Sequence, residues 1–245
     1  MKNKILSLIL IIFSNPVFAQ KQAGNILALN MTGGAFLPQA DLKQRFGQNF
    51  SNGLGLEIIK PNGLIFGVNG DYMYGKKVKE DILSTLYTRE GYIIGKNLSP
   101  ADVFLRERAI SIFANIGYIW QLKKSENLKG IRTSFGVGFL QHKIRIQDDS
   151  RTVSQLTGDY LKGYDRLTNG FSLQQFIGYQ YISQNRRINF FGGLEFIEAF
   201  TQNQRNWNWD TRQADKTKRI DILTGLKIGW ILPFYLNDKG EDYSY

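Results

Sequence analysis

Eight segments between Ile26 and Tyr235 alternate apolar residues with polar residues or glycine, and this alternation limits what the chain can fold into. The last segment is the clearest, because one parity holds Ile220, Ile222, Leu226, Ile228, Trp230, Leu232 and Phe234. The other parity holds Arg219, Asp221, Gly225, Lys227 and Gly229. Successive side chains of a strand point to opposite faces, so each strand is expected to have one apolar face and one polar or charged face.

The N-terminus has the pattern of an export signal. Lys2 and Lys4 precede a short apolar run at 5–13, and Val17-Phe18-Ala19 fits a small-residue cleavage site. We expect residues 1–19 to be a signal peptide; the alternative is a retained membrane anchor, for which the apolar run is short. The sequence contains no cysteine, which excludes disulfides, thiolate metal sites and a lipidated cysteine.

Alternating strands behind an export signal predict a transmembrane β-barrel, with lipid outside and polar side chains inside. In the fifth segment the alternation changes phase near Leu140, which indicates a β-bulge or emergence from the membrane. A sheet edge in lipid would leave backbone groups unpaired, so the sheet must close. We therefore predict an all-β fold, an eight-stranded antiparallel up-and-down barrel within residues 20–235. Its expected strands are 26–36, 53–60, 64–74, 109–120, 131–146, 170–182, 188–200 and 220–235.

Short and long connections alternate between these strands. The short ones, expected in the periplasm, are 61–63, 122–130 and 184–187. The long ones, expected outside the cell, are 36–52, 75–108, 148–169 and 201–218. Both chain ends would then be periplasmic, with a short tail at 236–245. We expect the long loops to form an ordered cap, to offer a docking surface, or to pack against one another.

The second long loop carries a helical pattern. Val78, Ile82 and Leu86 are spaced four residues apart, which predicts a short amphipathic helix over 78–87.

Acidic and basic residues share the inward-facing parity of several strands. Because buried charges must be paired, we predict a salt-bridge network in the lumen. Its expected members are Glu57, Asp71, Arg132, Glu195, Arg219, Asp221 and Lys227. The lumen of eight strands is just wide enough to be filled by side chains. This favours a plugged barrel, with a narrow channel for small solutes as the alternative.

His142 is the only histidine, and Asp148 and Asp149 follow a few residues later. A His–Asp pair could activate water or a serine, as in an outer-membrane lipid-modifying enzyme. However, the sequence contains no Gly-x-Ser-x-Gly, His-Glu-x-x-His or Asp-rich calcium motif. We interpret His142 as a surface residue at the barrel rim, and expect no catalytic, cofactor-binding or metal-binding residue.

The formal net charge is +10, yet the basic residues are spread over loops and turns without one stripe, which disfavours nucleic acid as a partner. Outer-membrane lipid and lipopolysaccharide are the simpler partners for loop cations, which include Lys76, Lys77, Lys79, Arg106, Arg108, Lys216 and Lys218. The last loop also carries Trp207 and Trp209 beside an arginine, a composition common at protein interfaces. The alternatives are that these tryptophans stack on sugars or lie at the lipopolysaccharide boundary.

Three segments resemble those of small outer-membrane β-barrels of the Bacteroidota, a Gram-negative phylum: DLKQRFG at 41–47, GYDRLTNG at 163–170 and GLKIGWILPFY at 225–235. The last resembles the signal read by the barrel-assembly machinery, which implies that Trp230, Phe234 and Tyr235 guide insertion. The barrel is also similar to the membrane half of OmpA- and OmpX-type proteins. Only residues 236–245 follow it, so no peptidoglycan-binding domain is expected.

The resemblance implies a non-enzymatic protein of the outer membrane. It would act as a structural or scaffolding subunit, with protein partners in a larger outer-membrane assembly of the secretion or barrel-assembly type.

Overall fold

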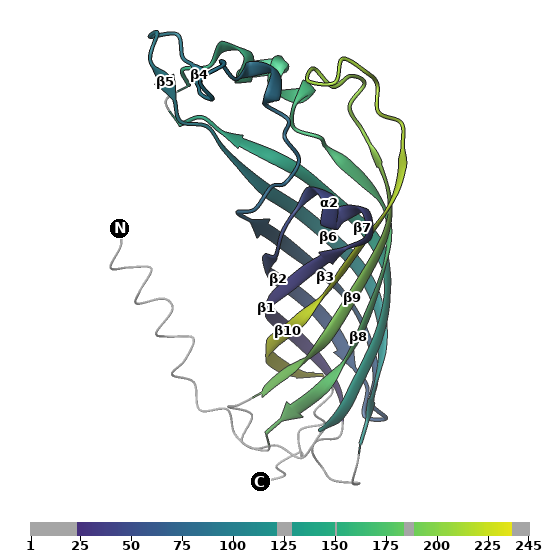
Figure 1. Cartoon of the computed structure of the whole chain (residues 1–245). Coiled ribbons are helices and arrows are strands. Elements are labelled where there is room, and N and C mark those ends of the chain that lie inside the picture. The colour runs from purple at the N-terminus through teal and green to yellow at the C-terminus, as the bar shows by residue number, and fades with distance from the viewer. Residues whose placement is uncertain (1–23, 122–128, 150, 184–188, 237–245) are drawn as a thin grey trace, which may run out of the picture.

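Each of the eight long strands pairs antiparallel with two neighbours, which closes the sheet into a barrel (Figure 1). The computed structural model describes residues 24–121, 129–149, 151–183 and 189–236. The strands are β1 (Asn25–Gln39), β2 (Asn49–Ile59), β3 (Leu64–Gly75), β6 (Phe104–Trp120), β7 (Gly130–Gln147), β8 (Thr168–Ile182), β9 (Asn189–Asn203) and β10 (Lys218–Leu236).

Closure comes from the pairing of the first strand with the last. β1 and β10 pair from Asn25↔Leu236 to Gln39↔Ile222, so the backbone groups at both ends of the sheet are satisfied. The predicted all-β, eight-stranded antiparallel barrel is confirmed. The expected signal peptide at 1–19 lies outside the described residues, as does all of the expected tail except Leu236, the last residue of β10.

Several strands run further than the sequence pattern predicted. β1 continues to Gln39, and β2 begins at Asn49, because Phe36 still finds Asn49 as its cross-strand partner. What remains of the expected loop at 36–52 is a short helix, α2 (Ala40–Arg45), and three further residues. The first long loop was therefore predicted too long.

β7 contains no bulge at Leu140. β6 and β7 stay in register from Trp120↔Ile131 to Phe104↔Gln147. What changes near Leu140 is the side on which apolar residues lie. Phe139 faces outward, whereas Leu140 and Ile144 face inward and are buried. The change of phase in the sequence therefore marks a level in the barrel. Below it, apolar side chains cover the outer wall, and above it, toward the cap, they fill the core inside the barrel.

The turn between β2 and β3 forms as predicted at 61–63. Gly63 N donates to the Lys60 carbonyl at 2.9 Å, and Gly63 has a φ of +91°, which favours glycine. The other two predicted short connections lie wholly or mostly outside the described residues.

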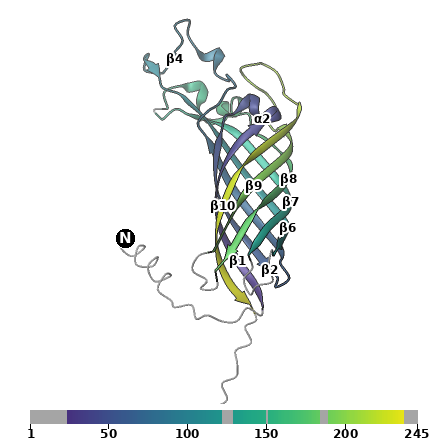
Figure 2. The same ribbon diagram turned by 60° about the horizontal axis from the view of Figure 1, so that its bottom comes forward.

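The long connections gather at the opposite end of the barrel, where they form a cap (Figures 1 and 2). The cap comprises α2 and residues 76–103, 151–167 and 204–217. Its regular elements beyond α2 are β4 (Ile93–Ile94), β5 (Pro100–Ala101) and the 3₁₀ turns η1 (Ser84–Leu86), η2 (Ser154–Leu156) and η3 (Gly158–Gly163).

The amphipathic helix predicted over 78–87 does not form, and η1 is the only helical turn within that range. The backbone at its start is extended, because Val78 forms a β-bridge with Phe46. Lys79 N also donates to the Arg45 carbonyl at 2.8 Å. Pairing with the chain that follows α2 thus replaces the hydrogen bonds that a helix would have made.

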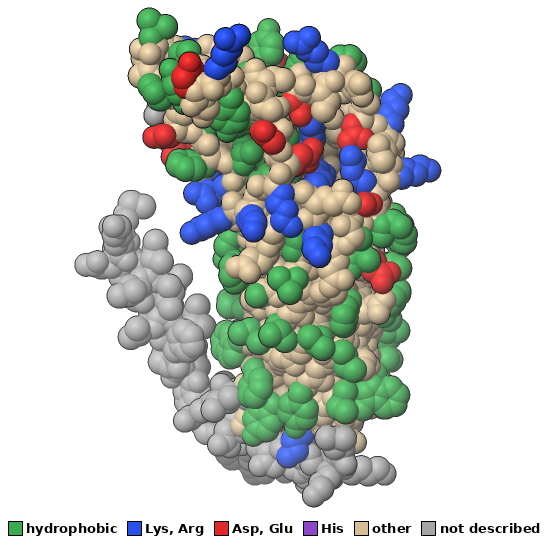
Figure 3. Space-filling model, in the orientation of Figure 1, with side chains coloured by type: hydrophobic (Ala, Val, Ile, Leu, Met, Phe, Trp, Pro, Cys, Tyr) green, Lys and Arg blue, Asp and Glu red, His purple; other side chains and the backbone are tan. Residues whose placement is uncertain are grey.

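The outer wall of the barrel carries a broad belt of exposed apolar side chains. Ile112, Leu226 and Ile228 are 60%, 63% and 68% exposed. Figure 3 shows hydrophobic side chains over the visible barrel wall, with charged side chains gathered at the cap end. In the described residues, no helix is long and apolar enough to cross a membrane.

Candidate functional site

Lys227 is the centre of a buried ion-pair cluster in the lumen. Its Nζ lies 2.9 Å from Asp71 Oδ2 and 3.0 Å from Glu195 Oε2, and all three side chains are at most 4% exposed. Gln174 Nε2 donates to Glu195 at 2.9 Å. The cluster joins β3, β8, β9 and β10, because β-strand alternation turns these residues inward. It therefore ties together strands that are not all neighbours in the sheet.

Arg132 is the centre of a second buried ion-pair cluster, which lies nearer the end of the barrel opposite the cap. Its guanidinium pairs with Glu57 and donates to Gln180 Oε1 at 2.8 Å. The guanidinium carbon also lies 4.3 Å from the ring centroid of Phe191 and 5.9 Å from that of Phe176. A planar cation between a carboxylate and aromatic faces regains part of the interaction that it loses with water.

Apolar clusters lie on both sides of these polar residues within the barrel. The cluster at the cap end includes Phe36, Phe113, Leu140 and Leu223, together with cap residues such as Ile82. The cluster at the other end includes Ile26, Ile59, Ile65, Ile119, Phe176, Phe191 and Ile231. Between them, a cavity lined by both charge centres has a volume of about 30 Å³, enough for one or two waters.

His142 is not a surface residue at the barrel rim, and that interpretation was wrong. The side chain is 1% exposed and faces the lumen, where its Nε2 lies 2.8 Å from Asp221 Oδ2. Asp148 and Asp149, the acids near it in sequence, are not its partners. The inward parity of β7 decides this position: His142 shares it with the buried Leu140 and Ile144.

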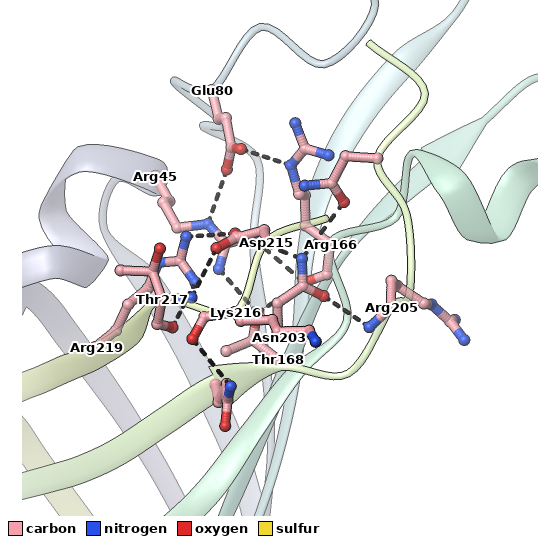
Figure 4. Close-up of polar contacts among 12 residues, drawn as sticks. Arg45, Glu80, Arg166, Thr168, Asn203, Arg205, Asp215, Lys216, Thr217 and Arg219 are labelled. Carbon is pink, nitrogen blue, oxygen red and sulfur yellow. Dashed lines mark hydrogen bonds and ion pairs between the residues drawn. The ribbon is translucent and has the colours of Figure 1, made fainter. Parts of the chain in front are cut away.

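Arg219 does not join the charge pairs deeper in the lumen, contrary to prediction. It lies at the cap end of β10 and pairs with Asp215 at 2.6 Å (Figure 4). Burial raises the pKa of the Asp215 carboxyl, but hydrogen bonds from Arg219 and Thr217 outweigh burial and lower it to about 2. The predicted luminal residue Asp221 bonds instead with His142 and with Thr201 Oγ1.

A further charged cluster, which we call the rim cluster, anchors the cap to the barrel (Figure 4). It consists of Arg45, Glu80, Arg166 and Asp210. Glu80 accepts from Arg45 Nε at 2.8 Å and from Arg166 Nε at 2.7 Å. Arg166 also pairs with Asp210, and Arg45 donates to Thr168 Oγ1 at the start of β8. Four segments that are distant in sequence are thus held by one group of charges.

The electrostatics of the rim cluster favour its charged state. Burial raises the pKa of the Glu80 carboxyl, but Arg45 and Arg166 outweigh it, so the pKa lies below its usual value. Burial lowers the pKa of the Arg166 guanidinium, but Glu80 and Asp210 more than compensate and raise it. Arg166 has a φ of +50°, a conformation that residues other than glycine rarely adopt, and the surrounding ion pairs hold it there.

The two tryptophans of the last long loop lie on the cap, where both are 44% exposed. Trp209 N donates to the Gly163 carbonyl at 3.1 Å, and its ring lies 6.3 Å from that of Tyr160. A Cβ at Gly163 would meet Trp209 at 1.6 Å, so only glycine fits beneath the indole. Both predicted interaction residues are therefore exposed, and Trp209 is also held in position by its contacts with Gly163 and Tyr160.

The residues of the predicted assembly signal occupy the end of β10 that pairs with the start of β1. Trp230 and Phe234 are on the outer wall, 38% and 50% exposed. Tyr235 packs against the apolar cluster at the end of the lumen farther from the cap. A role in insertion stays a prediction.

The residues missed by sequence reasoning are those of the rim cluster. Arg166 and the neighbouring Asp165 stand within the quoted segment at 163–170, but nothing in the sequence links Glu80 to Arg45 or Arg166. Among the described residues, no group of three or more histidine or acidic side chains is arranged to hold a metal ion.

No family model matches this sequence, and no curated protein matches it. Several solved structures are similar in fold. Neisserial surface protein A is 12% identical, with a TM-score of 0.45 over 86% of this chain and 100% of that one. Ail from Yersinia pestis is 11% identical, with a TM-score of 0.39 over 86% and 99%. The outer membrane protein OprG from Pseudomonas aeruginosa is 9% identical, with a TM-score of 0.40 over 89% and 100%.

Proposed function

We propose that this protein is a non-enzymatic outer-membrane barrel with a closed lumen, which presents its rigid cap to a protein partner outside the cell. The proposal rests on two observations together. Side chains fill the lumen, and buried ion pairs hold the cap in place. It would act as a structural or scaffolding subunit, an accessory component of a larger outer-membrane assembly.

The membrane location is supported by the exposed apolar belt. Residues such as Ile112, Leu226 and Ile228 would be costly to expose to water over so large a continuous surface. Lipid hydrocarbon covers such a belt without that cost. A closed sheet also meets the requirement that backbone groups in lipid be paired within the protein.

The orientation follows from the two ends of the barrel. In barrels of this class the short turns are periplasmic and the long loops extracellular. The cap is therefore assigned to the cell exterior. Asn25 and Leu236, which are cross-strand partners, lie at the opposite end, which supports a periplasmic location for both ends of the barrel.

The filled lumen argues against a channel. An ion or solute would have to pass the apolar cluster at each end and the paired charges around Lys227 and Arg132. The cavity between them holds only about 30 Å³. His142 is equally enclosed, so a lipid substrate would not reach it without opening the barrel.

The cap offers the surface for a partner. Leu98 is 89% exposed and Tyr160 is 64% exposed, and both lie on the cap together with Trp207 and Trp209. Exposed aromatic and apolar residues on a rigid surface are typical of protein interfaces, because little ordering is needed on binding.

The first experiment is purification of the tagged protein from its native membrane in mild detergent, with stoichiometric partners identified by mass spectrometry. We expect a partner to co-purify with the wild type and to be lost from a Leu98→Ser, Tyr160→Ser, Trp209→Ser variant. Substitution of Lys60→Ser and Asn62→Ser, at the opposite end of the barrel, serves as the matched control.

Two results would contradict the proposal. One is a wild-type protein that is inserted in the native membrane but purifies from it without a partner. The other is stable single-channel conductance in a planar bilayer, which would make the protein a channel.

A further inference from the structure

The upper edge of the apolar belt is marked by polar residues that face outward. On seven of the eight barrel strands, the outward residue that follows the last exposed apolar side chain toward the cap is polar. On β6 the polar Arg108 follows Ile110, although Phe104 at the start of that strand is exposed again. These polar residues are Gln39, Gln48, Lys76, Arg108, Gln141, Asn169, Gln202 and Lys218. Most are neutral amides, so the cationic positions among them stand out.

Positive charge is concentrated on the outward face of β6 and β7, in a group that we call the cation ladder. It consists of Arg106, Arg108, Lys143 and Arg145. In the register of the two strands, Arg106 is opposite Arg145 and Arg108 is opposite Lys143. Directly opposite residues of a strand pair have Cβ atoms about 5 Å apart, so four cations share one small patch.

The ladder has no acidic partner among the described residues. Arg106 Nε donates to Gln147 Oε1 at 3.1 Å, and Arg108 Nη1 donates to the Glu107 carbonyl at 2.6 Å. The Glu107 carboxylate itself faces the lumen, where Asn49 donates to it at 2.9 Å. Like charges directly opposite each other are destabilising. Lys227 in the lumen, by contrast, is paired with Asp71 and Glu195. We therefore expect the four cations of the ladder to bind an anion that is not part of the chain.

The position of the ladder selects the kind of anion. Arg108 and Lys143 lie two residues beyond the pair Ile110↔Gln141 toward the cap. Ile110 is the last exposed apolar residue of β6 before the ladder, and Phe104, which is 55% exposed, lies beyond the ladder at the start of the strand. At about 3.4 Å per residue, a step of two residues is roughly 7 Å along the strand. The headgroup layer outside the hydrocarbon is itself about 5–8 Å deep on each side. Arg108 and Lys143 thus lie at the level of lipid phosphates, and Arg106 and Arg145 lie two residues further toward the cap.

We propose that the outward face of β6 and β7 is a binding site for the phosphate group of an anionic lipid in the outer leaflet, held by Arg106, Arg108, Lys143 and Arg145. The inference rests on the proposed membrane location. The guanidinium groups supply paired donors that match phosphate oxygens, and Lys143 adds a point charge. An acyl chain of the same lipid would lie against Ile110, Ile112 and Phe139 below.

The test uses the full chain in zwitterionic detergent micelles and native mass spectrometry, with diphosphoryl lipid A as the probe and dephosphorylated lipid A as the reference. We expect the wild type to bind the phosphorylated lipid about tenfold or more tightly than the dephosphorylated one. Each cation near the lipid surface strengthens binding of an anionic lipid about fivefold. The variant Arg108→Gln, Lys143→Gln, Arg145→Gln should lose this preference. The control Lys43→Gln, Lys96→Gln, Lys216→Gln removes the same charge from the cap and should keep it.

Other results overturn the inference. Equal preference in the ladder variant and the wild type would show that the ladder does not hold the phosphate. Displacement of lipid A by millimolar inorganic phosphate would make this a free-phosphate site. A wild type that fails to insert into liposomes refutes the membrane location, and the inference with it, whereas insertion without lipid preference refutes the inference alone. If the triple variant does not fold, the single substitutions Lys143→Gln and Arg145→Gln should each weaken the preference about fivefold.

Discussion

His142 on β7 and Asp221 on β10 meet inside the barrel, with 2.8 Å between Nε2 and Oδ2. The two strands are separated in the sheet by β8 and β9, so the contact spans the lumen. Thr201 on β9 donates to the same carboxylate oxygen. The only histidine of the chain thus serves to hold the barrel wall together.

Replacing His142 by leucine should destabilise the barrel. We expect no loss of an enzymatic activity, because His142 is assigned a structural role. Asp221 would lose its main partner in a buried position, which costs about 1–3 kcal/mol. Urea unfolding in detergent, followed by the mobility of folded and unfolded forms on gels, measures this loss. Adding Asp221→Asn should recover part of it, because a neutral amide costs less to bury than a carboxylate. No recovery would contradict the role assigned to the pair.

Removing the charge of Lys227 should have a larger effect. Lys227→Met would leave Asp71 and Glu195 facing each other unpaired, and breaking a buried ion pair in this way costs about 3–5 kcal/mol. The free energy of unfolding in the same assay tests this, with the exposed Lys216→Met expected to stay within about 0.5 kcal/mol of wild type. Similar values for the two variants would show that the luminal cluster does not stabilise the barrel.

Loss of the Glu80 charge should loosen the cap while the barrel stays folded. Glu80→Gln would remove the carboxylate that the guanidinium groups of Arg45 and Arg166 share. These two side chains are only 8% and 4% exposed. We expect local opening to become easier by about 2–3 kcal/mol. Faster amide hydrogen exchange in 76–103, with unchanged exchange in β1 and β10, is the measurement. The exposed Glu90→Gln is the control and should leave the exchange unchanged.

The pair of Asp215 and Arg219 should make stability depend on acid pH. The Asp215 pKa falls from 3.8 to about 2 in the folded chain, so the pair stabilises the fold above about pH 4 and the effect is lost toward pH 2. The shift corresponds to at most about 2 kcal/mol, and solvent screening reduces this value because Asp215 is only partly buried. The difference in unfolding midpoint between wild type and Asp215→Asn should therefore be full at pH 6 and shrink at pH 3. A difference in unfolding midpoint that stays the same from pH 6 to pH 3 would contradict the lowered pKa of Asp215.

Part of the site could be read from the strand pattern. Alternation assigns Lys227 and Asp71 to the inward face, and a closed barrel brings inward charges together, so their proximity was predictable. The rim cluster was not, because Glu80 and Arg166 lie in loops without periodicity and meet only through the folding of the cap. The expected helix over 78–87 failed for a related reason: contact with Phe46 imposed an extended backbone on Val78.

The sequence by itself determined the number of strands, the face on which most strand side chains lie and the closure of the sheet. A period of two and the need to pair every backbone group admit few other arrangements. Only the tertiary structure decided which charges pair. The partner of His142 is Asp221 rather than Asp148 because pairing depends on register and strand tilt across the lumen. The opposition of Arg106 to Arg145 likewise depends on the register of β6 and β7.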